Sequence, residues 1–191
     1  MRNRFTLGVA LWVAVGLATS CTGQYPKGTF LNGDKDALQS FANYAPLRPV
    51  EGMKEDTLNQ FNEDTVIYRF TWLRTFDHPM VFKLTVVDGV GEFNWKECDG
   101  ASGYEIGNMI VDDHRFLREE EYARFVQLFD AMDFYHLQRG SEHGLDGATW
   151  IMEACSDHYW AVVRWSPDNG AFRDCCLYLL LLSGLKVNDI Y

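Results

Sequence analysis

The stretch TVIYRFTWLRTF, residues 65–76, alternates large apolar side chains with polar ones, and this period of two is typical of a β-strand. In an extended strand successive side chains point to opposite faces, so the alternation gives one apolar and one polar face. The apolar side carries Val66, Tyr68, Phe70 and Trp72, and the polar side carries Arg69 and Thr71. The pattern predicts a strand in an antiparallel sheet with one face packed on a core.

Neighbouring segments repeat this alternation. MVFKLTVV, residues 80–87, is followed by the hairpin signal Asp88-Gly89, after which Phe93 and Trp95 alternate with polar residues. Three further strands are expected at residues 108–115, in ATWIMEAC at 148–155 and in YWAVVRWS at 159–166.

Two segments change to the helical period. REEEYARFVQLFDAMDFYHL, residues 118–137, places Tyr122, Phe125 and Phe129 at spacings of three and four, which predicts an amphipathic helix. AFRDCCLYLLLLSGL, residues 171–185, predicts a more deeply buried helix that ends at Gly184. Shorter helices are expected at residues 34–44 and 54–62. We therefore predict one α+β domain over residues 30–191, with about six mainly antiparallel strands and helices packed on one face.

The N-terminus has the features of an export signal. Arg2 and Arg4 precede a run of 14 uncharged residues, 5–18, which as a helix spans about 21 Å, short of the ~30 Å core of a bilayer. A basic start, a short apolar run and small residues before a cleavage point are typical of a secretory signal peptide, here residues 1–20.

Ala18-Thr19-Ser20 lead directly into Cys21. This stretch resembles the lipobox of bacterial lipoproteins, and the resemblance implies a lipid on Cys21, palmitate included, and a tether over residues 21–29. It also implies an exported protein of the cell envelope, and Thr22 in place of Asp favours the outer membrane where there are two. Ordinary secretion with cleavage near the same point, and an uncleaved anchor, remain as alternatives.

The distinctive C-terminal pattern of Asp146-Gly147, Trp150, Glu153, Tyr159 and Arg164-Trp165-Ser166-Pro167 resembles uncharacterised bacterial proteins, and the resemblance implies no activity.

The charge balance restricts the partners. The net charge is −10, and removal of residues 1–20, with two arginines and no acid, brings it to −12. A chain this acidic is unsuited to binding nucleic acid. The partners we expect are the membrane, through Cys21, and an envelope protein or a small acidic ligand.

Four cysteines remain after Cys21, and none has the spacing of a zinc site: Cys98, Cys155, Cys175 and Cys176. They are either free and buried or include a disulfide such as Cys155 with one of the adjacent pair.

Two clusters resemble parts of catalytic sites. Asp112-Asp113-His114 is read as a solvated strand end or as part of a proton-transfer or metal site, with His136 or His143 as a further ligand. Cys155 and His158 are read as packing residues or as a nucleophile with its base. Neither cluster is complete, so we expect no metal and no cofactor.

The polar sheet face is the candidate binding face. Arg69, Thr71, Lys83, Thr85, Lys96, Glu153 and Arg164 are expected to project from it, either as a basic surface for acidic groups or as an ordinary solvated face paired through Glu153 and Arg164. By the same alternation Trp72, Trp95, Trp150 and Trp165 belong to the core, and Trp160 does not. The sequence favours a tethered binding module; an exported enzyme and a purely structural envelope protein are the alternatives.

Overall fold

The protein is an α+β domain, described by a computed structural model over residues 65–137, 144–156 and 159–191. The expected signal peptide, the tether, the helices at residues 34–44 and 54–62, His143 and His158 lie outside these residues.

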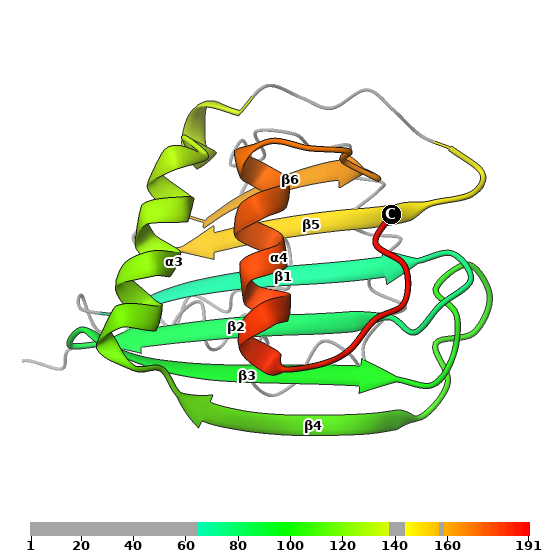
Figure 1. Ribbon diagram of the computed structural model, residues 1–191, viewed down its shortest axis with the longest axis horizontal. Helices are drawn as coiled ribbons and strands as arrows, with labels where there is room; N and C mark the ends of the chain where they lie inside the picture. The colour runs from blue at the N-terminus through cyan, green and yellow to red at the C-terminus, as the bar shows by residue number, and fades with distance from the viewer. Residues whose placement is uncertain (1–64, 138–143, 157–158) are drawn as a thin grey trace, which may run out of the picture.

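Six strands form one antiparallel sheet in the order β4-β3-β2-β1-β5-β6 (Figure 1). Their bounds are β1 Thr65–Arg74, β2 Met80–Val87, β3 Val90–Cys98, β4 Met109–Phe116, β5 Ala148–Cys155 and β6 Tyr159–Trp165. The first four strands form a meander, whereas β5 returns to pair with β1. The alternation of apolar and polar residues thus predicted the strand number and the antiparallel pairing correctly.

The β2–β3 hairpin has the turn that its sequence predicts. Asp88 and Gly89 both have positive φ angles, 51° and 77°. Two successive residues of this kind form the turn whose twist matches that of the flanking strands.

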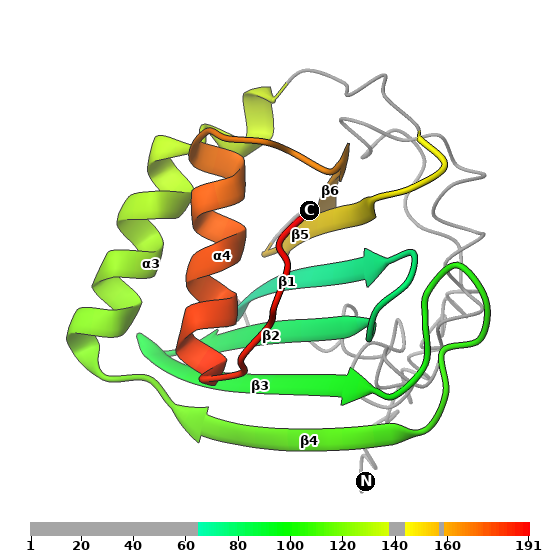
Figure 2. The same ribbon diagram turned by 45° about the vertical axis from the view of Figure 1, so that its right-hand side comes forward.

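Two long helices lie side by side on one face of the sheet (Figures 1 and 2). They are α3, Glu119–Ala131, and α4, Ala171–Ser183, and the short 3₁₀ helix η2, Phe134–His136, follows α3. The helix α3 is shorter than its periodicity predicts, because Asp133 adopts a left-handed conformation with φ 49° and breaks it. Gly184 ends α4 with φ 70°, as predicted. None of the helices in the described part of the chain is both long and apolar enough to cross a membrane.

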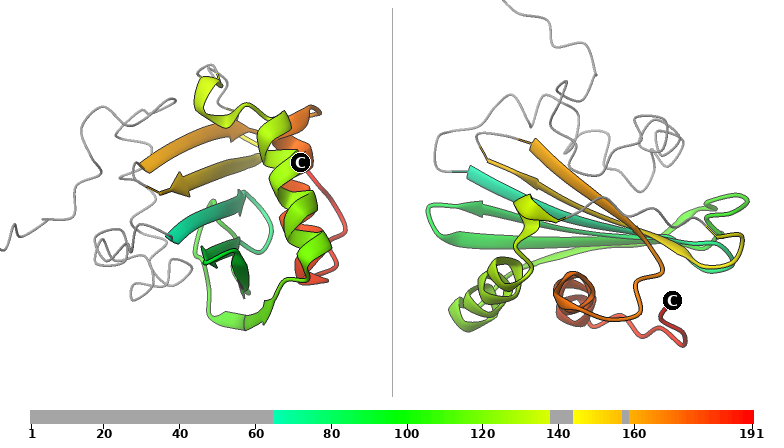
Figure 3. Two further views of the ribbon diagram at one scale, coloured as in Figure 1. Left: turned by 90° about the vertical axis from the view of Figure 1, so that its left-hand side faces the viewer. Right: turned by 90° about the horizontal axis from the view of Figure 1, so that it is seen from above.

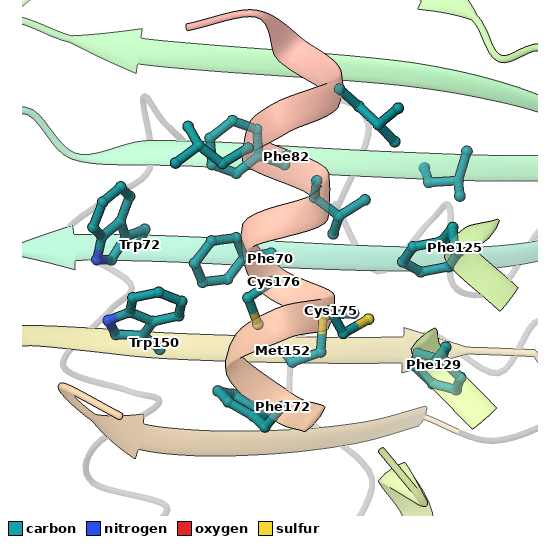
Figure 4. Packing of buried hydrophobic residues seen from close by; sticks show 14 of the residues in the cluster. Phe70, Trp72, Phe82, Phe125, Phe129, Trp150, Met152, Phe172, Cys175 and Cys176 are labelled. Atoms are coloured by element: carbon teal, nitrogen blue, oxygen red, sulfur yellow. The ribbon is translucent and has the colours of Figure 1, made fainter. Parts of the chain in front are cut away.

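The hydrophobic core lies between these helices and the sheet (Figure 4). From the strands come Phe70, Trp72, Phe82, Leu84, Phe93, Trp150 and Met152, and from the helices come Phe125, Phe129, Phe172, Cys175, Cys176 and Leu179. We call this side of the sheet the helix face and the other side the second face. Seen from above, both helices lie on the same side (Figure 3).

Candidate functional site

The strand pairing brings four of the five predicted binding residues to the second face. Arg69 lies opposite Lys83 on β2 and opposite Glu153 on β5, and Lys96 lies on β3 one diagonal step from Lys83. These residues are central in the sheet, as the alternation predicts.

Arg164 is the exception, and its expected place was wrong. It lies opposite Trp150 on the helix face, where its Cζ is 5.7 Å from the centre of the Phe172 ring. Burial there lowers the pKa of its guanidinium. The strand β6 carries apolar residues on both sides, so its alternation did not determine which side packs on the core. The pairing of Glu153 with Ala161 determines it instead.

Trp165 was misplaced for the same reason. It lies opposite Thr149, on the second face, whereas Trp72, Trp95 and Trp150 are buried on the helix face as expected. The expectation for Trp160 was wrong as well. It lies on the helix face and packs against the core, where its ring meets Tyr135 edge-on at 5.7 Å between centroids.

Arg69 and Glu153 form a two-pronged ion pair at the centre of the second face. The Nε and Nη2 groups of Arg69 donate to the two carboxylate oxygens of Glu153. Only 3% of the Arg69 side chain and 2% of the Glu153 side chain are exposed. A buried pair of this geometry is mutually satisfied and is not a basic group that awaits a ligand.

The other cations of the second face also have carboxylates near them. Lys96 donates to Asp112 at 2.7 Å. Burial lowers the pKa of Lys83, and Arg69 lowers it further, while nearby Glu92 acts in the opposite direction. The second face is therefore close to charge balance. Glu153 pairs with Arg69, and not with Arg164 as the sequence suggested.

The Asp112-Asp113-His114 cluster lies on the edge strand β4. Asp112 is engaged with Lys96, and Asp113 accepts a hydrogen bond from the main-chain N–H of His114 at 2.8 Å. Leu117 N donates to Gly91 O across the pairing with β3, so by alternation the N–H of His114 points away from the sheet. Asp113 thus accepts a hydrogen bond from a main-chain N–H on the open edge of the sheet. Charged side chains on an edge strand commonly prevent edge-to-edge pairing with another chain. The cluster is exposed to solvent in the middle of the edge strand, and not at a strand end as expected. Within the described residues no three acidic, histidine or cysteine side chains gather as metal ligands.

The four described cysteines are free and buried. Cys155 lies on the second face, across from Ile67, whereas Cys175 and Cys176 belong to α4 and are buried in the core on the helix face. A disulfide between them would have to pass through the sheet, so of the two alternatives the structure agrees with free, buried cysteines. Burial, with a smaller effect of the Glu153 carboxylate, raises the pKa of Cys155 to about 11. A thiol in this state forms little thiolate near neutral pH.

The sequence analysis missed an exposed aromatic pair at the end of the sheet where β1 ends. The rings of Phe76 and Tyr104 are 6.2 Å apart between centroids and tilted by 37°. They are 55% and 75% exposed. Tyr104 lies at the tip of the loop that joins β3 to β4, and Phe76 lies just after β1.

This loop is held firmly in place. Its main chain forms a short ladder of hydrogen bonds, with Asp99 N to Asn108 O at 2.9 Å and Ala101 N to Glu105 O at 2.8 Å. Ser102 N and Gly103 N bind the carbonyls of Arg74 and Thr75, which fixes the tip against β1. Gly100 is required because a Cβ there would lie 2.0 Å from the carbonyl oxygen of Glu105. The signal available in the sequence was an aromatic residue between closely spaced glycines, at 100, 103 and 107.

Comparison of the chain with protein-family models, with curated proteins and with solved structures finds no match.

Proposed function

We propose that the protein is an exported lipoprotein of the cell envelope, anchored by a lipid on Cys21, that acts by binding another envelope protein. The anchor rests on the short apolar run and the Ala18-Thr19-Ser20-Cys21 stretch that follows it. Residues 21–29 serve as the tether, and the outer membrane is favoured where the envelope has two membranes.

The exposed aromatic pair of Phe76 and Tyr104 is the observation that supports binding. Keeping a large aromatic side chain exposed to water costs free energy, and such side chains are enriched at the centres of protein interfaces. A hydrogen-bonded loop that holds such a pair outward lowers the entropy lost on binding. We therefore assign the partner to this end of the sheet and not to the second face, whose charges are already matched.

The enzyme alternative receives less support from the described residues. The raised pKa of Cys155 opposes its use as a nucleophile, and Asp112 is engaged by Lys96. The small acidic ligand also loses its basis, because it required an open basic surface.

The anchor is tested by substitution of Cys21. In cells supplied with radiolabelled palmitate, the native protein takes up label, while Cys21→Ser takes up none and keeps the full precursor length. Equal labelling of the two proteins would refute the anchor.

Binding is tested with the mature protein as bait in detergent extracts of the envelope. We expect a captured protein that is lost with Phe76→Ser combined with Tyr104→Ser. Val90→Ser is the matched control, since Val90 is 57% exposed on the hairpin at the other end of the sheet. Capture that survives the double substitution would place the partner elsewhere.

A further inference from the structure

The second face of the sheet is buried although no described helix or strand covers it. Both described helices pack on the helix face (Figure 3). Yet the second face includes residues that are less than 9% exposed: Ile67, Thr71, Leu73, Val81, Ile151, Cys155 and Ala161. On a bare sheet face such side chains would remain in contact with water, so this face requires a third layer.

The charged pair leads to the same conclusion. Arg69 and Glu153 lie opposite each other at the centre of the second face and are almost completely buried. The covering layer therefore reaches the centre of the sheet.

The extent of the burial outlines the cover. The buried residues come from β2, β1, β5 and β6, whereas toward the other edge Glu92, Asn94 and Lys96 are only partly buried and Asp112 is 56% exposed. Four neighbouring strands at ~4.8 Å spacing span about 14 Å. A helix of 11 residues, the length expected for residues 34–44, is about 16 Å long.

We propose that residues 30–64 of this chain pack on the second face as the third layer of the domain. These residues continue directly into β1, a strand with neighbours on both sides, so the chain reaches the sheet next to this face. Leu38, Phe41 and Ala42 provide an apolar stripe at helical spacing. Because the segment is covalently attached, its effective concentration at the face exceeds that of any free partner. This packing leaves only the tether, residues 21–29, between the lipid and the domain. Beyond the lipidated Cys21, the tether has eight residues and reaches roughly 28 Å when fully extended. Only this last step rests on the proposed anchor.

The cysteines offer a test with an internal control. Cys155 reports on the second face, and Cys175 and Cys176 report on the helix face. In the mature protein, residues 21–191, we expect a maleimide reagent to label all three slowly, with each site quantified by peptide mass spectrometry. Leu38→Asp combined with Phe41→Asp should raise the labelling rate of Cys155 at least tenfold and leave Cys175 and Cys176 unchanged. Ser40→Asp, on the polar side of the expected helix, should change none of them.

Several outcomes would overturn the proposal. Rapid labelling of Cys155 in the native protein would show that the face is open. Continued protection in the double variant would assign the cover to another molecule, and protection that falls on dilution would assign it to a second copy of the chain.

A second measurement applies if the double variant labels at all three cysteines, which would indicate unfolding. A protease site inserted between Asp64 and Thr65 is cleaved after the full chain has folded. We expect the released segment to remain with residues 65–191 on size-exclusion chromatography at micromolar concentration. Separation of the two fragments would refute the proposal.

Discussion

Trp72 and Trp150 lie directly opposite each other on β1 and β5, and both donate their indole N–H to the same main-chain oxygen, that of Tyr191. The distances are 3.3 Å and 3.0 Å, and both rings are fully buried. The indoles point in the same direction toward the end of the sheet (Figure 4). Buried indole donors need an acceptor, so the segment after α4 completes the core and is part of it.

Trp150→Phe tests this arrangement. The substitution keeps an aromatic ring but removes one of the two donors, so we expect an extra loss of about 0.5–1.5 kcal/mol over the effect of reduced volume. Trp95→Phe is the matched control, because Trp95 is buried on the same face and donates no described hydrogen bond to this oxygen. Urea denaturation of both variants gives the difference, and equal losses would mean that the shared acceptor contributes nothing to stability.

Glu153→Gln should destabilise the domain by about 3–5 kcal/mol. It leaves the buried Arg69 guanidinium without a carboxylate, and an uncompensated buried charge is costly. Asp112→Asn breaks the more exposed pair with Lys96 and should cost less than about 1 kcal/mol. Chemical denaturation at neutral pH checks both values. Similar effects of the two substitutions would contradict the distinction between a buried and an exposed pair.

Phe125→Ala should cost about 3–5 kcal/mol, because it removes a fully buried ring and leaves a cavity. The Phe125 ring lies 4.9 Å from that of Tyr68 and 5.9 Å from that of Phe129, between centroids. Arg124→Ala, on the exposed side of the same helix, provides the control. A loss below about 1 kcal/mol in denaturation would be inconsistent with the way α3 packs on the sheet.

Glu121 should make stability depend on pH. Hydrogen bonds from Arg115 and Arg118 lower the pKa of its carboxyl from 4.5 to about 2. The same carboxylate accepts the main-chain N–H of Arg118 at 2.9 Å, at the start of α3. A lowered pKa in the folded state means that the stabilisation is complete above pH 4.5 and is lost as the pH falls toward 2.

Substitution of this residue isolates the effect. The difference in unfolding free energy between the native protein and Glu121→Gln should be constant from pH 5 to 7 and should shrink between pH 4.5 and 2. Glu120→Gln, an exposed neighbour in the same turn, serves as the control. Denaturation curves at several pH values test this, and a difference that does not vary with pH would count against the assignment.

Local patterns predicted the elements well because each depends on neighbouring residues. The alternation along residues 65–76 and the Asp88-Gly89 turn need no information from the rest of the chain. The orientation of β6 was different, since Val162 and Val163 are both apolar and only the pairing with β5 determines which one faces the helices.

The candidate site was predicted in composition but not in environment. Arg69, Lys83, Lys96 and Glu153 do share a face, as the period of two requires. Arg69 and Glu153 are nevertheless buried, and strand periodicity carries no information on what packs against a sheet face. The aromatic pair of Phe76 and Tyr104 was missed because its two residues come from separate loops.

The pairing of β1 with β5 has a consequence for the rate of folding. The strands β1 to β4 form successive hairpins between near neighbours, whereas the Arg69–Glu153 pair joins residues 84 positions apart. Closing a long loop costs entropy before its contacts are made, so the meander is expected to form first and the β1–β5 seam later. Substitutions at this seam, such as Ile151→Val, should therefore accelerate unfolding while leaving the refolding rate nearly unchanged, whereas Leu84→Ala in the meander should slow refolding. Under the proposed export, which starts at the N-terminus, the sheet would acquire its last two strands only after α3 had crossed the membrane.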